Sequence, residues 1–465
     1  MMTLNLAVRN LLRNRRRSLA TVLAMAIGSA SILLFGGFST NVKYELHTRH
    51  VQKGGHVQIQ HRDFYLYGSG NPTAYGINDY EKIVTAIQND EVLRNMVLVA
   101  TPALQFGGIA GNYAASVSRT IIGTGIVAED INRMRRWNEF DLRTKAPASA
   151  LEAAPGDSAV VGTGVARVLQ LCDALKIDNC AKPEKDQKTD GKELPNDIVQ
   201  LSLQETAVAS GVSGASSSRV EVLVVNARGA PNVTSLNVIR AEDQGVKELD
   251  DVSIMMHLVQ LQKLIYGKSP PKATAIMLQL RRSDQIPAAL ARLAPILSTF
   301  STSQPLAALD FRALNPFYVQ TMQMFDTIFG FVFVLIGGIV LFTVSNTMNT
   351  TIVERTVEIG TLRAIGLRRA GVLRLFVTEG ALLGLFGAVL GLVLALVLAI
   401  AINQIGTPWL PPGNVELVPF TVNVWGENRM IFGTTISLTC IAIISAWWPA
   451  YRAARLDVVE ALRHV

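Results

Sequence analysis

Four histidines near the start of the chain are the first residues whose type and spacing could do chemistry. His47, His50, His56 and His61 lie close together, and imidazole nitrogens are common metal ligands. The spacing of His47 and His50 could place them on one helix face, but the other two belong to a segment that alternates like a strand. No cysteine or carboxylate cluster at ligand spacing supports them. We therefore expect no metal site and interpret these histidines as solvated residues just outside a membrane.

A second candidate chemistry is nucleotide binding. Gly267-Lys268-Ser269 resembles the end of a phosphate-binding loop, but Gln262 occupies the position of the required first glycine. The tripeptide is also expected to end a helix, whereas a phosphate-binding loop opens one. No other segment places a Gly-rich loop after a strand, and no G-x-S-x-G nucleophile elbow is apparent. We therefore expect no catalytic residue and no cofactor on this chain.

The chain has three cysteines, and none has the C-x-x-C spacing of a zinc site. Cys440 lies inside an apolar run. Cys172 and Cys180 flank a short polar stretch, and they could form one local disulfide if that part of the chain faces an oxidising compartment. Two unpaired core cysteines are the alternative.

A charged segment between two apolar runs, residues 354–379, offers a docking surface rather than a reaction centre. Ile359, Leu362 and Ile365 recur at helical spacing and would form an apolar stripe, while Gly360 and Gly366 permit close approach or a turn. A solvated connector is the plainer alternative. The candidate site residues are Glu354, Arg355, Glu358, Ile359, Gly360, Leu362, Arg363, Ala364, Ile365 and Gly366.

Long apolar runs on either side of this segment indicate a membrane protein. With a mean hydropathy of +0.30 and 17% charged residues, the 465-residue chain is too apolar for an ordinary soluble protein. Four uncharged runs reach the roughly 20 residues that a helix needs to cross a bilayer. We assign four transmembrane helices to residues 18–42, 325–353, 380–403 and 430–451.

Arginines set the orientation of these spans. They gather before the first span, between the second and third, and after the fourth, so the positive-inside rule places all three groups in the cytoplasm. Residues 1–17 would form an interfacial helix, 452–465 a cytoplasmic tail, 404–429 an external loop and 43–322 an extracytoplasmic domain. A cleaved signal peptide is the alternative for the first run, which is longer than such a peptide needs. The net charge of +7 lies in these flanks, and we therefore expect no nucleic-acid partner.

The extracytoplasmic domain has a mixed α/β pattern. A capping box of Asn78 and Glu81 predicts one helix, residues 252–266 predict another that ends at Gly267, and Ile286 to Leu297 predicts a third. Residues 182–196 and 210–218 lack apolar periodicity and look disordered or inserted. Strands are predicted at residues 56–61, 120–122, 158–161, 198–203, 220–225 and 275–280.

The segment after the second span resembles the FtsX-like permease family, of the MacB, LolC/LolE and FtsX type, whose motif reads approximately E-R-x-x-E-I-G-x-x-[KR]-A-[IL]-G. The family's C-terminal pattern is matched in part, with Val458 where proline is usual. The basic segment at residues 10–18 also resembles the N-terminus of the family. The matching residues are Glu354, Arg355, Glu358, Ile359, Gly360, Arg363, Ala364, Ile365 and Gly366, then Pro449, Ala450, Ala453, Ala454, Ala461 and Leu462.

This resemblance implies a type VII ABC transporter membrane subunit, with four transmembrane helices and a large α/β, MacB-like periplasmic core domain between the first two. The motif would form a coupling helix in a cleft of a separate ATPase subunit, present in two copies and holding ATP and Mg²⁺. Replacing Glu358 or Gly360 is expected to uncouple ATP hydrolysis from function. Membrane glycines would let helices pack across a dimer with a second permease copy or a paralogue; they are Gly330, Gly337, Gly338, Gly384, Gly387 and Gly391.

The resemblance further implies a multi-pass protein of the bacterial inner membrane, with both termini cytoplasmic and the large domain periplasmic. ATP-driven movement of that domain (mechanotransmission) would export a peptide, drug or lipid. Lipoprotein release of the LolC/LolE kind and FtsX-like regulation of a periplasmic hydrolase are the alternatives. Further partners would be a periplasmic adaptor with an outer-membrane channel, or a lipoprotein chaperone. A sensory receptor would need a cytoplasmic signalling bundle, and no segment is long enough for one.

Overall fold

The computed structural model describes residues 2–13, 15–68, 70–143, 146–177, 218–301, 304–410 and 417–457. It divides into two units. The helical unit comprises Met1–Leu46, Phe317–Trp409 and Val418–Val465, and the α/β unit comprises His47–Pro316 and Leu410–Leu417. Cys180 and the predicted strand at 198–203 lie outside the described residues, as do residues 182–196 and 210–217. The Cys172–Cys180 disulfide therefore stays a prediction.

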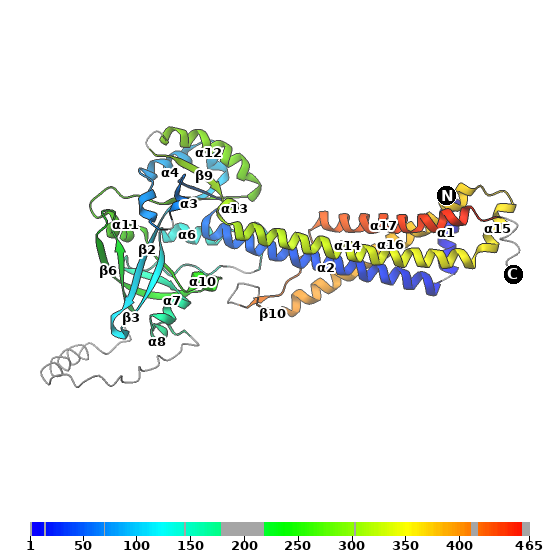
Figure 1. Ribbon diagram of the computed structural model, residues 1–465, viewed down its shortest axis with the longest axis horizontal. Coiled ribbons are helices and arrows are strands. Elements are labelled where there is room, and N and C mark those ends of the chain that lie inside the picture. Colours follow the sequence, from blue (N-terminus) through cyan, green and yellow to red (C-terminus); the bar gives the residue numbers. More distant parts are fainter. Residues whose placement is uncertain are drawn as a thin grey trace. The chain divides into compact units, whose positions relative to one another are not determined.

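Four long helices form the helical unit, and each is long and apolar enough to cross a membrane (Figure 1). They confirm the four predicted transmembrane helices. The first continues well past residue 42, and the third ends where Gly406 adopts a left-handed conformation, φ 58°. The helices are α2 (Arg15–Gly54), α14 (Pro316–Glu354), α16 (Arg369–Ile405) and α17 (Asn428–Ala454).

Glycines of α16 pack against helices of the same chain. A Cβ added at Gly391 would lie 2.5 Å from the Cβ of Ser29 in α2, and one at Gly384 would lie 2.7 Å from that of Ala442 in α17. Gly384 and Gly391 permit close helix packing within one chain. The expectation that they pack against a second copy was therefore wrong. A Cβ at Gly330 or Gly338 would meet no atom of the described residues within 4 Å.

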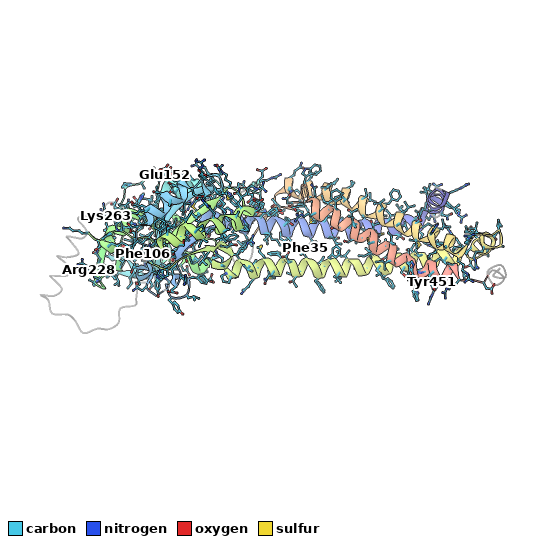
Figure 2. The ribbon with its side chains drawn as sticks, turned by 90° about the horizontal axis from the view of Figure 1, so that it is seen from above. Phe35, Phe106, Glu152, Arg228, Lys263 and Tyr451 are labelled. Carbon is cyan, nitrogen blue, oxygen red and sulfur yellow. The ribbon has the colours of Figure 1, made fainter. Side chains whose placement is uncertain are left out.

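The α/β unit contains a nine-stranded sheet in the order β3-β7-β4-β6-β5-β2-β8-β1-β9. Because β3 also pairs with β2, the first six strands of this order close into a ring. The buried side chain of Phe106, which is labelled in Figure 2, belongs to the hydrophobic core of this ring. The strands are β1 (Val57–His61), β2 (Val97–Asn112), β3 (Val117–Ile126), β4 (Ser158–Gly162), β5 (Arg219–Val225), β6 (Pro231–Glu242), β7 (Ser253–His257), β8 (Ala275–Leu280) and β9 (Leu306–Asp310).

The rest of the sheet is an antiparallel layer in the order β2-β8-β1-β9. Helix α4 (Tyr80–Asn89) connects β1 to β2, and α12 (Ile286–Phe300) connects β8 to β9. This chain order is the β-α-β-β-α-β motif, with the remaining strands of the ring inserted between β2 and β8. In the motif β9 is a terminal strand, paired only with β1.

Shorter helices complete the structure. Those of the helical unit are α1 (Met2–Arg13) and α15 (Thr356–Ala364), together with the two-residue strands β10 (Pro408–Trp409) and β11 (Val418–Pro419). Those of the α/β unit are α3 (Phe64–Tyr67), α5 (Leu93–Met96), α6 (Ala128–Arg135), α7 (Thr163–Val168), α8 (Cys172–Leu175), α10 (Lys247–Asp250), α11 (Leu258–Tyr266) and α13 (Phe311–Leu314).

Two helix predictions need correction. Residues 253–257 form strand β7, so only the second part of the predicted helix at 252–266 is helical, as α11. The spacing of apolar residues in this segment fits both a helix and a strand. The alternating burial of Ile254 and Met256 in the ring is that of a strand. Asn78 is not the cap of α4: Asp79 precedes the helix at φ 51°, and the Asn78 N–H donates to the Gln304 side chain.

Candidate functional site

The motif segment forms a short helix between two long ones. Helix α14 ends at Glu354, Arg355 occupies the N-cap position of α15 without a side-chain capping bond, and α15 runs from Thr356 to Ala364. Gly366 follows at φ +106°, a conformation that favours glycine. Helix α16 begins at Arg369, so residues 369–379 belong to its first turns. The predicted loop is therefore mostly helical.

One side of α15 packs against its own chain. Ile359 is 3% exposed and belongs to a cluster with Ile352 of α14, Phe376 of α16 and Ala450 of α17. Gly360 is buried beside it, and Arg363 donates to the Leu456 carbonyl oxygen. Ile359 is therefore not available to a partner, and the predicted stripe of Ile359, Leu362 and Ile365 does not lie on one free face.

The other side of α15 carries exposed apolar side chains. Ile365 is 80% exposed, Val357 is 44% exposed and Leu362 is 36% exposed. Ala364 is exposed as well. Two residues of the predicted stripe thus remain accessible, and Val357 joins them.

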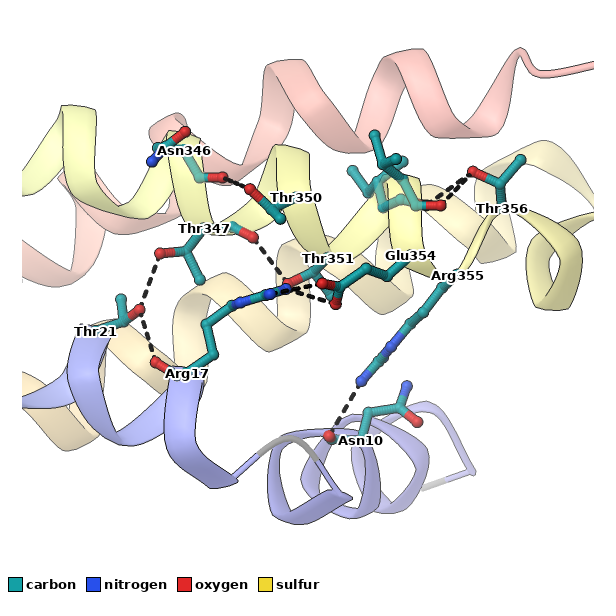
Figure 3. Close-up of polar contacts among 12 residues, drawn as sticks. Asn10, Arg17, Thr21, Asn346, Thr347, Thr350, Thr351, Glu354, Arg355 and Thr356 are labelled. Atoms are coloured by element: carbon teal, nitrogen blue, oxygen red, sulfur yellow. Dashed lines mark hydrogen bonds and ion pairs between the residues drawn. The ribbon is translucent and has the colours of Figure 1, made fainter. Parts of the chain in front are cut away.

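Both motif glutamates form ion pairs with the basic N-terminal segment. Glu354 binds Arg17 of α2 through two hydrogen bonds of 2.6 Å, as Figure 3 shows. Glu358 accepts two bonds of 2.7 Å from Arg13 of α1. The side chains of the second pair are about half exposed, and exposed ion pairs contribute little to stability. Their geometry nonetheless joins α15 and the end of α14 to the start of the chain.

A buried polar cluster lies between these two pairs. The Arg355 guanidinium is 3.2 Å from the Glu379 carboxylate of α16, and the two side chains are 6% and 1% exposed. The Asn10 side chain of α1 donates to Glu379 at 2.7 Å. The Asn10 backbone carbonyl oxygen accepts from Arg355 at 3.1 Å, as Figure 3 shows. We call Asn10, Arg355 and Glu379 the buried clamp. It holds α1, the junction of α14 with α15, and α16 in one arrangement.

Sequence reasoning found the motif but missed its partners. The sequence placed Arg13 and Arg17 among the arginines that flank the first span, Asn10 in the basic segment at residues 10–18, and Glu379 at the end of the segment 354–379. Glu379 offered a signal, because a carboxylate at the start of a long apolar run needs a partner. The sequence alone does not show that this partner is Arg355.

A second polar cluster lies in the α/β unit. Nε2 of His47 is 2.8 Å and Nε2 of His56 is 3.3 Å from the Ser283 hydroxyl, which donates to Glu139 at 2.6 Å. We call these four residues the histidine cluster. His47 is 7% exposed and His56 is fully buried, so the interpretation as solvated residues was wrong for both. Burial, with a smaller contribution from the nearby His47, lowers the pKa of His56 to about 3.

The histidine cluster resembles a catalytic triad in composition, but the roles do not fit. Nδ1 of His56 accepts the Leu280 N–H at 3.0 Å. In the neutral ring, Nε2 therefore carries the proton and donates to Ser283. The single Ser283 proton is donated to Glu139, so neither His56 nor His47 accepts it as a base in this arrangement. His61, another of the four histidines considered as metal ligands, lies with Nδ1 3.9 Å from the Asp63 carboxylate. The described residues contain no group of three or more His, Cys, Asp or Glu side chains arranged to hold a metal.

Two family profiles match this chain. The profile of the FtsX-like permease C-terminal domain matches residues 327–458, which contain α15, α16, α17 and most of α14. The profile of the MacB-like periplasmic core domain matches residues 18–181. The chain thus carries an FtsX-like permease domain and a MacB-like periplasmic core domain.

Curated relatives of the permease agree with this assignment. An uncharacterised ABC transporter permease of Methanocaldococcus jannaschii is 34% identical over 120 residues, 26% of this chain and 28% of that protein. The macrolide export ATP-binding/permease protein MacB 1 of Yersinia pestis is 33% identical over 143 residues, 31% and 20% of the two chains. The lipoprotein-releasing system transmembrane protein LolC of Xylella fastidiosa is 25% identical over 240 residues, 50% and 56%. The matched segments thus span only part of each relative.

Solved structures similar to the permease are domains of such proteins. The extracellular domain of the noncanonic ABC-type transporter YknZ from Gram-positive bacteria matches with a TM-score of 0.27 and 13% identity, over 55% of this chain and 99% of that one. The periplasmic region of MacB from Actinobacillus actinomycetemcomitans matches with a TM-score of 0.26 and 12% identity, over 56% and 90%.

Proposed function

We propose that the permease is the non-catalytic, membrane-spanning subunit of an ABC transporter. A separate ATPase subunit, present in two copies, binds ATP and Mg²⁺ and hydrolyses the nucleotide. The proposal is supported by the family and by the lack of a phosphate-binding loop in the sequence. Two permease chains, identical or paralogous, complete the assembly.

Helix α15 is the proposed docking element for the ATPase, because one side of the helix is buried in the permease and the other side is exposed. Ile359 and Gly360 are buried within the permease, whereas Val357, Leu362 and Ile365 stay exposed. A short helix fixed on one side and apolar on the other fits the groove of a partner protein. Docking through the exposed side would leave the packing of Ile359 intact.

The buried clamp is the proposed first step of force transmission. A push on α15 reaches α1 and α16 through Arg355, because its guanidinium bonds to Asn10 and to Glu379. Helices α2 and α14 then carry movement along continuous helix toward His47 and Pro316, where the α/β unit begins. ATP hydrolysis would thereby move the α/β unit without a polar path through the spans.

The proposed orientation places α15 and both termini in the cytoplasm and the α/β unit in the periplasm of a bacterium. Arg9, Arg13 and Arg15–Arg17 precede the first span, and further arginines surround α15. This distribution follows the positive-inside rule. The MacB-like core profile at residues 18–181 agrees with a periplasmic position for the α/β unit.

Export of a peptide, drug or lipid from the periplasmic side is the proposed transport reaction, by analogy with the MacB relatives. Lipoprotein release is the second candidate. It is favoured by the alignment with LolC, which covers half of this chain. An assay with a purified lipoprotein in proteoliposomes separates the two, because only the second function releases lipoprotein into solution in the presence of ATP.

The docking proposal is tested by adding a charge to the exposed side of α15. Ile365→Glu should abolish co-purification with the ATPase and stimulation of ATP hydrolysis in nanodiscs, because it places a carboxylate in an apolar interface. Folding should be unchanged, since Ile365 is 80% exposed. Val259→Glu, which adds the same charge at a 61% exposed position of α11, is the matched control. Full ATPase coupling in the Ile365→Glu protein would refute docking through this side.

A further inference from the structure

One edge of the sheet in the α/β unit, formed by β9, has no partner strand among the described residues. Strand β9 ends the strand order, and within the described ranges it pairs with β1 alone. The other terminal strand of the order, β3, closes the ring by pairing with β2. An unpaired edge presents a row of backbone N–H and C=O groups that can pair with another strand.

The register of β9 identifies which backbone groups are free. The Arg62 N–H donates to the Pro305 carbonyl oxygen, and the Phe311 N–H donates to that of His56. Antiparallel pairs alternate in direction, so Ala307 and Leu309 also face β1. Leu306, Ala308 and Asp310 therefore direct their N–H and C=O groups away from the sheet. No backbone bond to the outer groups of Leu306 or Ala308 is found among the described residues, whereas the Asp310 carbonyl oxygen begins the hydrogen bonds of α13 and leaves only the Asp310 N–H for a partner.

A groove runs beside this edge. Its volume is about 640 Å³, and it lies between β9 and α12, two elements that are neighbours in Figure 1. This volume is within the roughly 300–1,000 Å³ of ligand sites. The walls are mostly apolar, with leucine and alanine side chains from both elements, and include Leu290, Leu297, Leu306 and Ala308.

Arg62 supplies the charge of the groove. It lines the groove at the end of β1, opposite Pro305. Its side chain is exposed and forms no ion pair with any described residue. A guanidinium in this position favours a carboxylate in the occupant.

We propose that the outer edge of β9 and the adjoining groove bind an extended, acidic peptide segment of another protein by β-strand addition. The backbone of the segment pairs with Leu306, Ala308 and Asp310. Alternate side chains enter the groove against α12, and a carboxylate binds Arg62. A lipid chain would fill only the apolar wall and leave the edge groups of β9 without partners. The proposal concerns a partner of the α/β unit and does not depend on docking of an ATPase at α15.

The test uses a displayed library of random peptides selected against the full chain in nanodiscs. Enriched peptides should contain an acidic residue and bind at least about tenfold more weakly to the Arg62→Gln and Ala308→Pro proteins. Proline is tolerated on an edge strand where the N–H points outward, so Ala308→Pro should fold normally. Thermal unfolding followed by circular dichroism checks this point.

Synthetic versions of the enriched peptides give a control that needs no altered protein. Methylation of alternate peptide nitrogens removes the donors to β9 and should abolish binding in one of the two alternating patterns. The proposal is overturned if no peptide is enriched over empty nanodiscs. It is also overturned if methylated peptides of both patterns bind as well as the parent, or if Arg62→Gln and Ala308→Pro leave binding unchanged.

Discussion

The buried clamp of the helical unit and the histidine cluster of the α/β unit both bury polar side chains, but the clamp buries them charged and the cluster buries His56 neutral. The clamp buries a guanidinium and a carboxylate that neutralise each other 3.2 Å apart. In the histidine cluster, His56 is neutral and its ring is satisfied by a backbone N–H and a hydroxyl. A buried charge depends strictly on its partner, whereas a neutral ring depends on pH. The two clusters should therefore respond to different perturbations.

Removing one charge of the buried clamp should give the largest effect. Glu379→Gln leaves the Arg355 guanidinium buried without a counter-charge, and arginine cannot lose its proton. We expect a loss of about 3–5 kcal/mol in the free energy of unfolding. Arg355→Met should cost less, because the Glu379 carboxyl can take up a proton. Thermal unfolding in detergent, followed by circular dichroism, measures both.

The matched control is the double variant Arg355→Met with Glu379→Gln. It leaves neither charge buried, so its loss should be clearly smaller than the sum of the two single losses. Strictly additive losses, or a Glu379→Gln protein as stable as the parent, would show that the two side chains are not coupled.

Acidification should affect the histidine cluster next. The pKa of His56 is about 3 in the folded protein, against about 6.5 when unfolded, so the unfolded chain binds more protons between these values. Its stabilising contribution is complete above about pH 6.5 and is lost as the pH falls toward 3. For this one group we expect a loss of about 2 kcal/mol between pH 7 and pH 5.

His56→Asn provides the comparison for the pH effect. The Asn carbonyl oxygen can still accept the Leu280 N–H, but the side chain no longer titrates. The difference in unfolding free energy between the parent and this variant should shrink from pH 7 to pH 5 in urea titrations. A difference that stays constant over that range would mean that His56 does not titrate as the cluster predicts.

The sequence predicted what depends on local pattern and missed what depends on contacts between distant segments. Apolar length placed the four spans, and a short β-rich run placed the fully buried β8, because burial of a whole segment leaves its mark on composition. Strand β2 was missed, since Pro102, Gly107 and Gly108 hide its pattern. The motif was visible at Glu354–Gly366, but the burial of Ile359 follows from α17, which lies far along the chain.

The exposed ion pair of Glu358 with Arg13 should give the smallest stability effect and so sharpens the contrast with the clamp. Glu358→Gln should change the unfolding free energy by less than about 1 kcal/mol, because both side chains are about half exposed. If the pair holds α15 against α1 during coupling, ATPase stimulation should nevertheless fall. The charge-swapped variant with Arg13→Glu and Glu358→Arg should restore it. The swapped protein keeps the ion pair but carries the arginine on α15 and the glutamate on α1. Restored stimulation would therefore assign the effect to the pair, whereas a direct contact of Glu358 with the ATPase predicts no rescue.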